Sequence, residues 1–496
     1  MFNFQVLSTF SPVETVLIPL QQVDDLQNIL AEIARYAGIQ AETLQADFKG
    51  EKKELLSFYT NKTDVKKIIL AGLGKTADFS PEILRQVVRL YVHKNKATLG
   101  ENLSVDVLQF SSLKNTEIPQ HILTEAIAAG SLLGTYEIGQ LKAEKPKAIK
   151  LSTILIHLSQ PQTASLGIAK GQIIAQAQMR AFDMVNLPSN YFTPEDFAKT
   201  AEKIAEETNI TADITAKIFR GDEIKKQKLK ALWAVGKGSV NTPTFSILEY
   251  KHEKATKTIA LVGKGVNFDT GGNNIKTQGM ALMKCDMAGG ATVLAAVEAI
   301  AKLGLAVNVV GIVPACENSV DGNAYKPSDI IDSYSGLTIE VEDTDAEGRL
   351  ILADGLSYVI KNYQPDYVLD IATLTGASVI TLGFVAGAMF TKNEELAKTL
   401  YDIGIETKEK LWALPMWDEY GDSLKSDMAD TKNWNGSPAG SIGAAKFLEK
   451  FTANHPAWVH LDVAGVSFTH SDFAKDRTAT AFGVRIFAEF AEKIAG

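Results

Sequence analysis

The sequence predicts an α/β protein of two domains, each a mainly parallel sheet flanked by helices. Two observations lead to this prediction. Short apolar runs of strand character alternate with longer segments of helical periodicity, and glycine-rich turns separate them. Alternation of this kind implies parallel strands whose crossover helices cover both faces of a sheet. The length of 496 residues is compatible with two large domains.

The first part of the chain contains the elements of one such domain. Its predicted strands lie at 67–71 and 153–158, and its predicted helices at 83–96 and 118–136. Gly72 closes the first strand, and Pro81 marks the start of the first helix, because proline is favoured at the first helical position. The segment 142–150 is basic and broken by proline. We therefore predict domains at 1–160 and 161–496.

The second domain is predicted to open with an entry linker helix and to continue as strand, glycine-rich turn and helix. Its predicted helices lie at 166–182, 194–207, 291–302, 349–361 and 477–495, and its predicted strands at 259–263, 306–313, 367–372 and 458–463. Active sites in sheets of this type lie beyond the carboxyl ends of the strands. Functional residues are therefore expected directly after these strands.

Composition and charge exclude several classes of protein. Hydrophobic residues make up 46% of the chain and charged residues 22%, which is ordinary globular composition. The net charge of −9 argues against a general nucleic-acid-binding role, because phosphate neutralisation needs a basic surface. Two cysteines cannot make a disulfide framework, which fits a reducing compartment. The uncharged run 371–391 continues a strand and contains three glycines, so we predict a cytoplasmic protein without a membrane span.

Carboxylates gather in two segments that each follow a predicted strand. Asp269 and Asp286 belong to the first segment, and Asp345 and Glu347 to the second. Because Asp345 and Glu347 are two residues apart, an extended stretch would point both carboxylates to one side. Four carboxylates in one cleft repel one another unless cations neutralise them, and two divalent ions would do so. The alternative is that these are solvated turn carboxylates and helix caps.

The positions of the histidines argue against a histidine-rich metal site and so favour oxygen ligands. There are seven, none forms His-Glu-x-x-His, and none lies in the two acidic segments. Oxygen ligands suit Mg²⁺ or Mn²⁺ and also accept Zn²⁺. Gly263 and Gly265 lack the third glycine of a dinucleotide-binding turn, and Cys285 has no local histidine to activate it as a nucleophile.

Four motifs of the second domain resemble those of one family. Residues 343–350 read DTDAEGRL and resemble the signature of the leucyl aminopeptidases, the M17 family of cytosolic two-metal exopeptidases. Residues 262–272, 370–377 and 458–465 are similar to three further blocks of that family, in the same order. The resemblance is specific from about residue 180 onward and looser before it.

The resemblance implies a role for each matching residue. The implied metal ligands are Lys264, Asp269, Asp286, Asp345 and Glu347, which would hold two divalent ions, Zn²⁺ or Mn²⁺, with Mg²⁺ or Co²⁺ as alternatives. The implied catalytic residues are Lys276, which would polarise the scissile carbonyl, and Arg349, which would hold a bicarbonate ion. The implied substrate-binding residues are Met283, Thr373, Leu374, Gly376 and Ala464.

The family also implies an activity and partners. We expect a metal-dependent aminopeptidase that releases Leu-like and other apolar residues from peptides with a free N-terminus, by attack of a metal-activated water. A homo-hexamer is expected, in which the first domain serves assembly or regulation. Alternatives from other classes are a DNA-binding regulator and a scaffold without activity, and a dipeptidase of the same mechanism is the alternative among enzymes.

Three positions depart from the family pattern. Asp343 replaces an asparagine of the signature and brings another negative charge to the site. The stretch between Lys276 and Asp286 is one residue shorter than the pattern, and Ser467 stands where a methionine can close the side-chain pocket. We expect these departures to affect substrate preference while leaving the ligand set complete.

Overall fold

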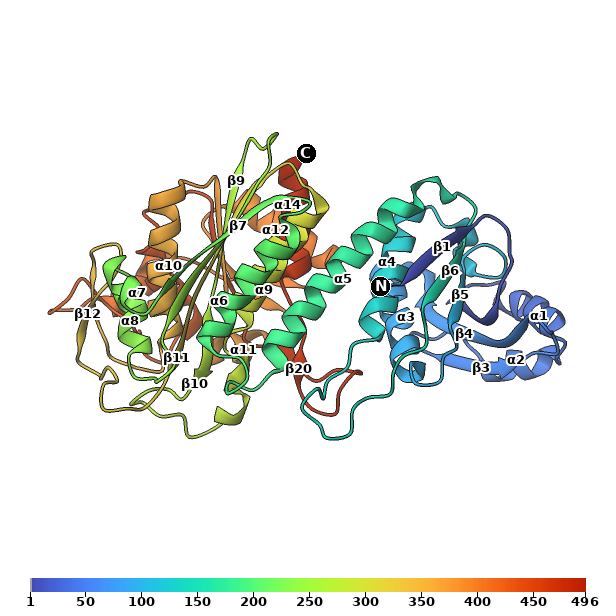
Figure 1. Ribbon diagram of the computed structural model, residues 1–496, viewed down its shortest axis with the longest axis horizontal. Coiled ribbons are helices and arrows are strands. Elements are labelled where there is room, and N and C mark those ends of the chain that lie inside the picture. Colours follow the sequence, from blue (N-terminus) through green and yellow to red (C-terminus); the bar gives the residue numbers. More distant parts are fainter. Residues whose placement is uncertain (1) are drawn as a thin grey trace. The chain divides into compact units, whose positions relative to one another are not determined.

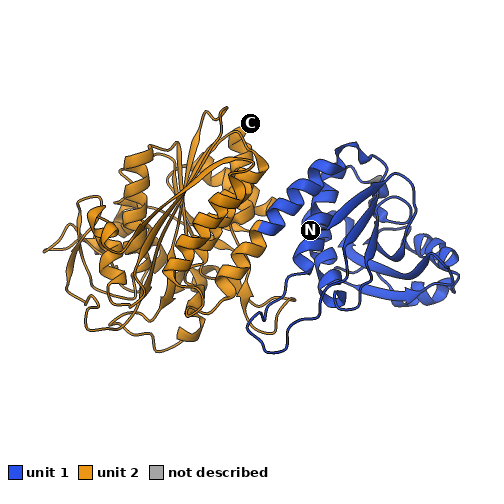
Figure 2. Ribbon diagram, viewed as in Figure 1, with its two compact units in different colours: residues 1–176 blue, residues 177–496 orange. Residues whose placement is uncertain are grey.

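The computed structural model describes residues 2–496 and confirms the predicted α/β class with two domains (Figure 1). The chain forms two compact units, residues 1–176 and 177–496, here called the N-terminal and C-terminal units (Figure 2). Helix α5 (Ala164–Asn186) begins in the first unit and continues into the second, so the unit boundary lies inside the helix that the sequence placed after residue 160.

The N-terminal unit is a six-stranded sheet in the order β1-β6-β5-β2-β4-β3. Its strands are β1 (Asn3–Leu7), β2 (Glu14–Gln22), β3 (Leu55–Tyr59), β4 (Val65–Lys75), β5 (Asn102–Asp106) and β6 (Thr153–His157), and its other helices are α1 (Leu26–Ala37), α2 (Ala41–Asp47), α3 (Pro81–Asn95) and α4 (Gln120–Gly134). All pairs are parallel except β3 with β4. Along β4, Ile69 packs in the same cluster as α3 and α4, whereas its neighbours Ile68 and Leu70 pack in that of α1. Helices therefore cover both faces.

The C-terminal unit contains a nine-stranded sheet in the order β16-β15-β18-β14-β9-β11-β8-β7, with β10 beside β11. These strands are β7 (Asp213–Arg220), β8 (Thr244–Lys251), β9 (Thr258–Gly263), β10 (Gly265–Asp269), β11 (Asn308–Asn318), β14 (Tyr367–Ala372), β15 (Gly387–Phe390), β16 (Leu411–Ala413) and β18 (Trp458–Asp462). The central strands β18, β14, β9 and β11 are parallel, and β8 and β15 flank them antiparallel. The carboxyl ends of the central strands thus meet along one edge.

Helices cover both faces of this sheet as well. On one face α9 (Ala288–Leu303) contacts α6 (Pro194–Thr208) and α14 (Val484–Ala495), and on the other α10 (Gly348–Tyr363) contacts α8 (Lys230–Gly236) and α13 (Gly440–Glu449). The remaining elements include α7 (Asp222–Lys226), α11 (Gly376–Leu382), α12 (Glu394–Thr407), a small sheet of β12 (Ile330–Asp332), β13 (Thr338–Glu340) and β17 (Thr431–Lys432), and the pair β19 (Phe468–Thr469) and β20 (Thr478–Ala479).

Close backbone packing places the start of α9 against the sheet. A Cβ built on Gly289 would lie 2.1 Å from the carbonyl oxygen of Ile371 in β14, and one on Gly263 would lie 2.4 Å from the oxygen of Gly289. Side chains at these positions would push the helix away from β9 and β14. The glycines therefore hold the helix start beside the strand ends where the acidic segments lie.

Two sequence predictions need correction. The closing helix begins at Val484, not at residue 477, because residues 478–479 pair with β19 and the backbone at Ala481 and Gly483 has positive φ (55° and 96°), which a right-handed helix excludes. Strand β11 continues to Asn318, five residues past its predicted end.

One helical stretch, Met280–Leu303, is long and apolar enough to cross a membrane by length and composition alone, and 67% of its apolar window is buried inside the protein. It includes α9, which lies against the sheet. The uncharged run 371–391 is divided among β14, α11 and β15.

Candidate active site

A cleft of about 970 Å³ lies at the carboxyl edge of the large sheet, within the C-terminal unit. Its walls come from the segments after β9, β10, β14 and β18 and from the start of α10. The structure places all twelve predicted site residues on these walls: Lys264, Asp269, Lys276, Met283, Asp286, Asp345, Glu347, Arg349, Thr373, Leu374, Gly376 and Ala464. Residues up to 200 positions apart in the sequence therefore meet at one edge.

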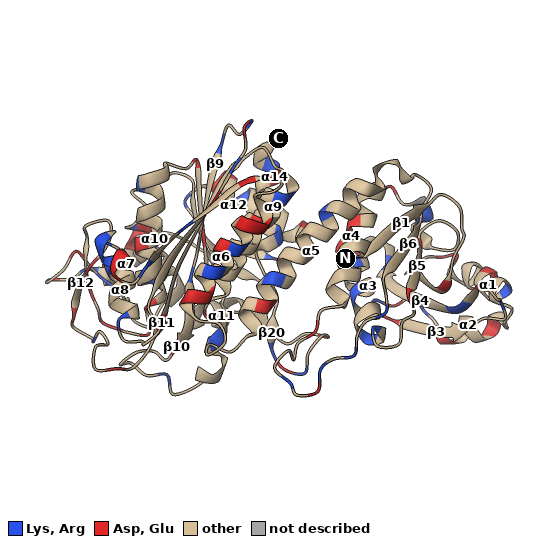
Figure 3. Ribbon diagram, viewed as in Figure 1, with Lys and Arg blue, Asp and Glu red and all other residues tan. Residues whose placement is uncertain are grey.

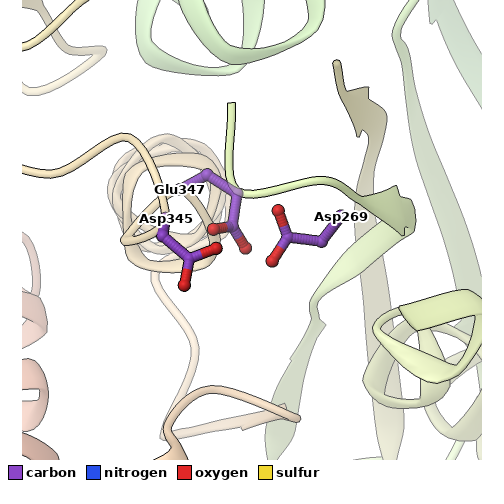
Figure 4. A group of neighbouring side chains, drawn as sticks. All are labelled: Asp269, Asp345 and Glu347. Atoms are coloured by element: carbon purple, nitrogen blue, oxygen red, sulfur yellow. The ribbon is translucent and has the colours of Figure 1, made fainter. Parts of the chain in front are cut away.

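Three carboxylates form the centre of the cleft. Ligand atoms of Asp269, Asp345 and Glu347 all lie within 4.8 Å of one another, and their side chains converge on a common point (Figure 4). The extended arrangement predicted for the last two is wrong: Asp345 lies in a turn, and Glu347 has helical dihedral angles (φ −78°, ψ −35°) directly before α10. The turn and the first helical residue nonetheless bring both carboxylates to the same side.

Two lysines lie among the carboxylates. The Nζ atom of Lys264 lies 2.8 Å from both Asp286 and Glu347 and donates to the carbonyl oxygen of Thr373 (3.1 Å). A Cβ on Gly348 would lie 2.6 Å from this Nζ, so glycine is needed there to leave room for it. The Nζ atom of Lys276 lies 2.7 Å from Asp269 and 2.5 Å from Asp345.

Burial and mutual repulsion shift the ionisation of this cluster. Burial raises the pKa of the Asp345 carboxyl to about 7, and the carboxylates of Asp269 and Glu347 add to the shift. Burial also raises the pKa of Asp286 and of Glu347, even though Lys264 lies beside them. For Lys264 burial acts in the opposite direction, but the surrounding carboxylates, Asp286 first, hold its pKa above the ordinary value. The cluster is thus short of positive charge.

The donor atoms of this cluster fit divalent metal ions. Among the described residues, the buried oxygens Oδ2 of Asp286, Oδ1 of Asp345 and Oε1 of Glu347 have only a lysine ammonium group beside them, and Oε2 of Glu347 has no partner. Carboxylate oxygens that converge on one point and are offset by too few positive charges are what Mn²⁺, Mg²⁺ or Zn²⁺ binds. Lys264 fits this set only as the neutral amine, so a bound ion has to displace its proton.

Two asparagines that the sequence analysis missed hold the acidic segments in place. Asn318 donates from Nδ2 to Asp269 (2.8 Å) and to the carbonyl oxygen of Thr344 (2.9 Å). Asn433 donates to the carbonyl oxygens of Asp343 (2.6 Å) and Ala346 (3.3 Å), and its Oδ1 accepts from the backbone N–H of Glu342 (2.8 Å). Both are fully buried and come from distant parts of the chain, so no local pattern indicates them.

Arg349 is buried beside this cluster. It donates from Nη1 to the carbonyl oxygen of Asn433 (2.8 Å), while its buried Nε has no acceptor among the described residues. Burial lowers its pKa to about 10, and the carboxylates of Glu347 and Asp343 oppose that shift. An unpaired, buried guanidinium N–H is a ready donor for an anion.

The wall predicted to bind substrate is fixed by Asp462. Its carboxylate accepts from the backbone N–H of Leu374 (3.2 Å) and from the hydroxyl of Thr375 (2.5 Å). The hydroxyl of Thr373 in turn donates to Asp286 (2.9 Å), which ties this wall to the acidic cluster.

The structure also shows where two of the three departures from the family pattern lie, Asp343 and Ser467. Asp343 lines the cleft and accepts from the backbone N–H of Asp345 (2.8 Å). Ser467 is buried, with 3% of its surface exposed, and the cleft wall is formed by the next residue, Phe468.

Comparison with known proteins bears on the family of the whole chain. The model of the cytosol aminopeptidase family, catalytic domain, matches residues 179–488, and that of the same family's N-terminal domain matches residues 13–145. The chain is 40% identical to a probable cytosol aminopeptidase of Chlorobium phaeobacteroides over 92% of each chain. It is 35% identical to one of Clostridium perfringens over 97% of this chain and 95% of that one.

Two solved structures share the whole architecture. A mutant of tomato leucine aminopeptidase superimposes with a TM-score of 0.88 at 29% identity, covering 99% of this chain and 97% of the other. The bottromycin maturation enzyme BotP in complex with Mn superimposes with a TM-score of 0.85 at 27% identity, covering 97% and 99%. With both family models matched and the acidic cleft in place, the chain belongs to the cytosol aminopeptidase family, the M17 leucyl aminopeptidases, which are metal-dependent hydrolases.

Proposed function

We propose that this enzyme releases Leu-like and other apolar N-terminal residues from peptides, using two divalent ions held by Lys264, Asp269, Asp286, Asp345 and Glu347. One observation carries the proposal: a cluster of carboxylates that converges at the carboxyl edge of the sheet, where only two lysine ammonium groups offset four carboxylates. Mn²⁺ or Zn²⁺ are the proposed ions, with Mg²⁺ or Co²⁺ as alternatives. When bound, such ions supply Lewis acidity toward the scissile carbonyl and the attacking water.

The remaining roles belong to the protein's own side chains. Lys276 lies at the edge of the cluster with 17% of its side chain exposed, from where its ammonium group can stabilise negative charge developing on the carbonyl oxygen. The buried Nε of Arg349 offers a donor to bicarbonate, which would supply a base for the water proton.

The wall at Leu374 and Gly376 orients the substrate. We assign the carbonyl oxygen of Leu374 and the N–H of Gly376 to the substrate's main chain, because Asp462 holds this loop through the N–H of Leu374 and the hydroxyl of Thr375. Met283, Thr373, Gly376 and Ala464 line the same cleft and would surround the first side chain. The apolar character of Met283 and Ala464 supports the preference for apolar residues.

The assembly and location are proposals as well. We propose a cytoplasmic homo-hexamer in which residues 1–160 serve assembly or regulation. Gel filtration combined with light scattering tests the assembly, and a monomer at working concentration would contradict it.

Hydrolysis of a leucyl chromogenic amide tests the activity. Protein stripped with a chelator should be inactive and should regain activity with Mn²⁺ or Zn²⁺, whereas Glu347→Gln should stay inactive with either ion. Glu342→Gln is the matched control, because Glu342 lies in the same segment but pairs with Lys432 outside the cleft. An N-acetylated substrate should not be cleaved. Two bound ions without hydrolysis of any peptide would refute the proposed activity.

A further inference from the structure

Four basic side chains line the cleft in the described chain, and three of them are engaged by the site itself. Lys264 and Lys276 lie between carboxylates, and Arg349 donates to the backbone of Asn433. The fourth, Arg477, is half-buried and has neither a carboxylate within 4 Å nor a hydrogen-bond acceptor among the residues that the structure describes. Whereas Arg349 keeps only its Nε without an acceptor, the whole guanidinium of Arg477 is therefore free to meet a ligand.

The position of Arg477 is fixed by its surroundings. Its guanidinium lies 5.0 Å from the centre of the Phe384 ring, within range of a cation–π contact. The next residues form β20, which pairs with β19, and Asn186 accepts from the hydroxyl of Thr478 and the N–H of Ala479 (both 3.0 Å). The backbone that carries the guanidinium is thus anchored on both sides of the strand, which reduces the entropic cost of binding a ligand.

Several apolar side chains line the same cleft as Arg477. Val379, Ile380, Phe384 and Phe468 line the same cleft, and so do Met283 and Ala464 of the proposed side-chain pocket. The carboxylates of the cleft lie in the segments around Asp269 and Asp345, where the two lysines pair with them. The cleft therefore offers carboxylates paired with lysines, apolar side chains, and one unpaired guanidinium beside Phe384.

We infer that Arg477 binds a carboxylate of the peptide substrate, so that the enzyme also accepts carboxylate-bearing peptides that its apolar side chains alone would reject. A guanidinium binds a carboxylate with two parallel hydrogen bonds, and partial burial strengthens the contact. Two groups of a peptide offer this chemistry: an acidic first side chain, and the C-terminal carboxylate of a dipeptide. The inference rests on the proposed aminopeptidase activity and adds to it a substrate class.

Four substrates separate these sources. Leucyl-anilide carries no carboxylate, glutamyl-anilide carries one on the first side chain, and leucyl-glycine carries one at its C-terminus that leucyl-glycinamide lacks. The variant Arg477→Met keeps the apolar stem and removes the charge, Arg477→Lys keeps the charge, and Lys475→Met is the matched control from the exposed part of the same loop.

For Arg477→Met we expect kcat/KM on at least one carboxylate-bearing substrate to fall by about tenfold to a hundredfold, the range for an ionic hydrogen-bonded contact. The loss should appear mainly in KM, leucyl-anilide should change less than about twofold, and Arg477→Lys should recover part of the loss. Loss on glutamyl-anilide identifies the side-chain source, and loss on leucyl-glycine but not leucyl-glycinamide identifies the terminal one.

Three outcomes would overturn the inference. They are an equal loss on all four substrates, no loss on any, and a wild-type enzyme that cleaves neither carboxylate-bearing substrate. All three outcomes count only if the metal-loaded wild-type enzyme hydrolyses leucyl-anilide. Failure of that reaction is instead a failure of the proposed function, so the two are distinguishable.

Discussion

At the scale of single residues, Asn433 contacts the segment that carries Asp345, Glu347 and Arg349 at four positions. Its amide group bridges the backbone of Asp343, Ala346 and Glu342, and its carbonyl oxygen accepts from Arg349. One buried side chain thereby fixes the turn that carries Asp345 and the start of α10 that carries Glu347. The precision of the cluster depends on this residue, although it touches none of the cluster's carboxylates in the contacts described.

We predict that Asn433→Asp weakens metal binding about tenfold to a hundredfold, the usual effect of losing a residue that orients ligands. The new carboxylate cannot donate to the carbonyl oxygens of Asp343 and Ala346, which it would face at hydrogen-bond distance. Calorimetric titration with Mn²⁺ measures the effect independently of activity. Asn362→Ala, an exposed asparagine of the same unit, should bind like the wild type. Unchanged affinity in Asn433→Asp would show that the turn carrying Asp345 keeps its conformation without the hydrogen bonds from Asn433.

At the scale of elements, the cleft depends on α9 reaching the strand ends. Gly289 allows that approach, and its substitution by alanine would put a Cβ 2.1 Å from the carbonyl oxygen of Ile371. Since that neighbour is backbone of β14, the helix has to move. We predict that Gly289→Ala lowers the free energy of unfolding by at least about 2 kcal/mol, within the range for overpacking a core. Denaturant unfolding measures it, and Gly322→Ala, which meets nothing within 4 Å, is the control. Equal stability of the two variants would show that α9 adjusts freely.

Helix α10 contains a second element-scale feature, the buried carboxyl of Asp354. It accepts from the backbone N–H groups of Leu232 (3.0 Å) and Tyr334 (2.7 Å), which joins α10 to α8 and to the loop after β12. Burial raises its pKa to about 7, and these hydrogen bonds only partly offset the shift. Between about pH 4 and pH 7 the unfolded chain therefore loses a proton that the folded chain keeps.

It follows that the contribution of Asp354 to stability falls as the pH rises through this window, by about 4 kcal/mol if the full shift is realised. Unfolding of the wild type and of Asp354→Asn at several pH values gives the contribution by difference, because the other titrating groups are common to both. A difference that grows with pH would mean that the hydrogen bonds dominate and the carboxylate is ionised in the folded state.

How far the sequence predicts these features depends on whether their cause is local. The strand at 367–372 is predicted to the residue and the one at 259–263 misses only Thr258, because continuous apolar runs have no alternative to burial. The helix predicted at 477–495 fails at its start, because the pairing of residues 478–479 with β19 is a contact that spacing does not reveal. The acidic residues can be recognised in the sequence because they form local motifs. Asn318, Asn433 and Arg477 belong to no such motif. Their roles arise only when distant segments meet.

At the scale of the whole molecule, charge is distributed rather than concentrated. Acidic and basic residues are interspersed over the helices of both units, and the net charge is −9 (Figure 3). The exception is the buried cluster of the C-terminal unit, where the charges of four carboxylates exceed those of two lysines. A buried site of this kind opposes folding when it is empty and stabilises the fold when cations bind.

Metal ions should therefore raise the thermal stability of the enzyme as a whole. Free Mn²⁺ at about 100 times its dissociation constant would add about 2.7 kcal/mol to the folded state, which amounts to a few degrees in Tm for a unit of this size. In Glu347→Gln the metal-dependent rise should be much smaller, because Glu347 offers the cluster two buried oxygens, one paired only with Lys264 and the other without a partner among the described residues. Glu342→Gln should show the full rise. Differential scanning calorimetry with and without chelator measures both, and an equal rise in Glu347→Gln and the wild type would place the stabilising ions outside this cleft.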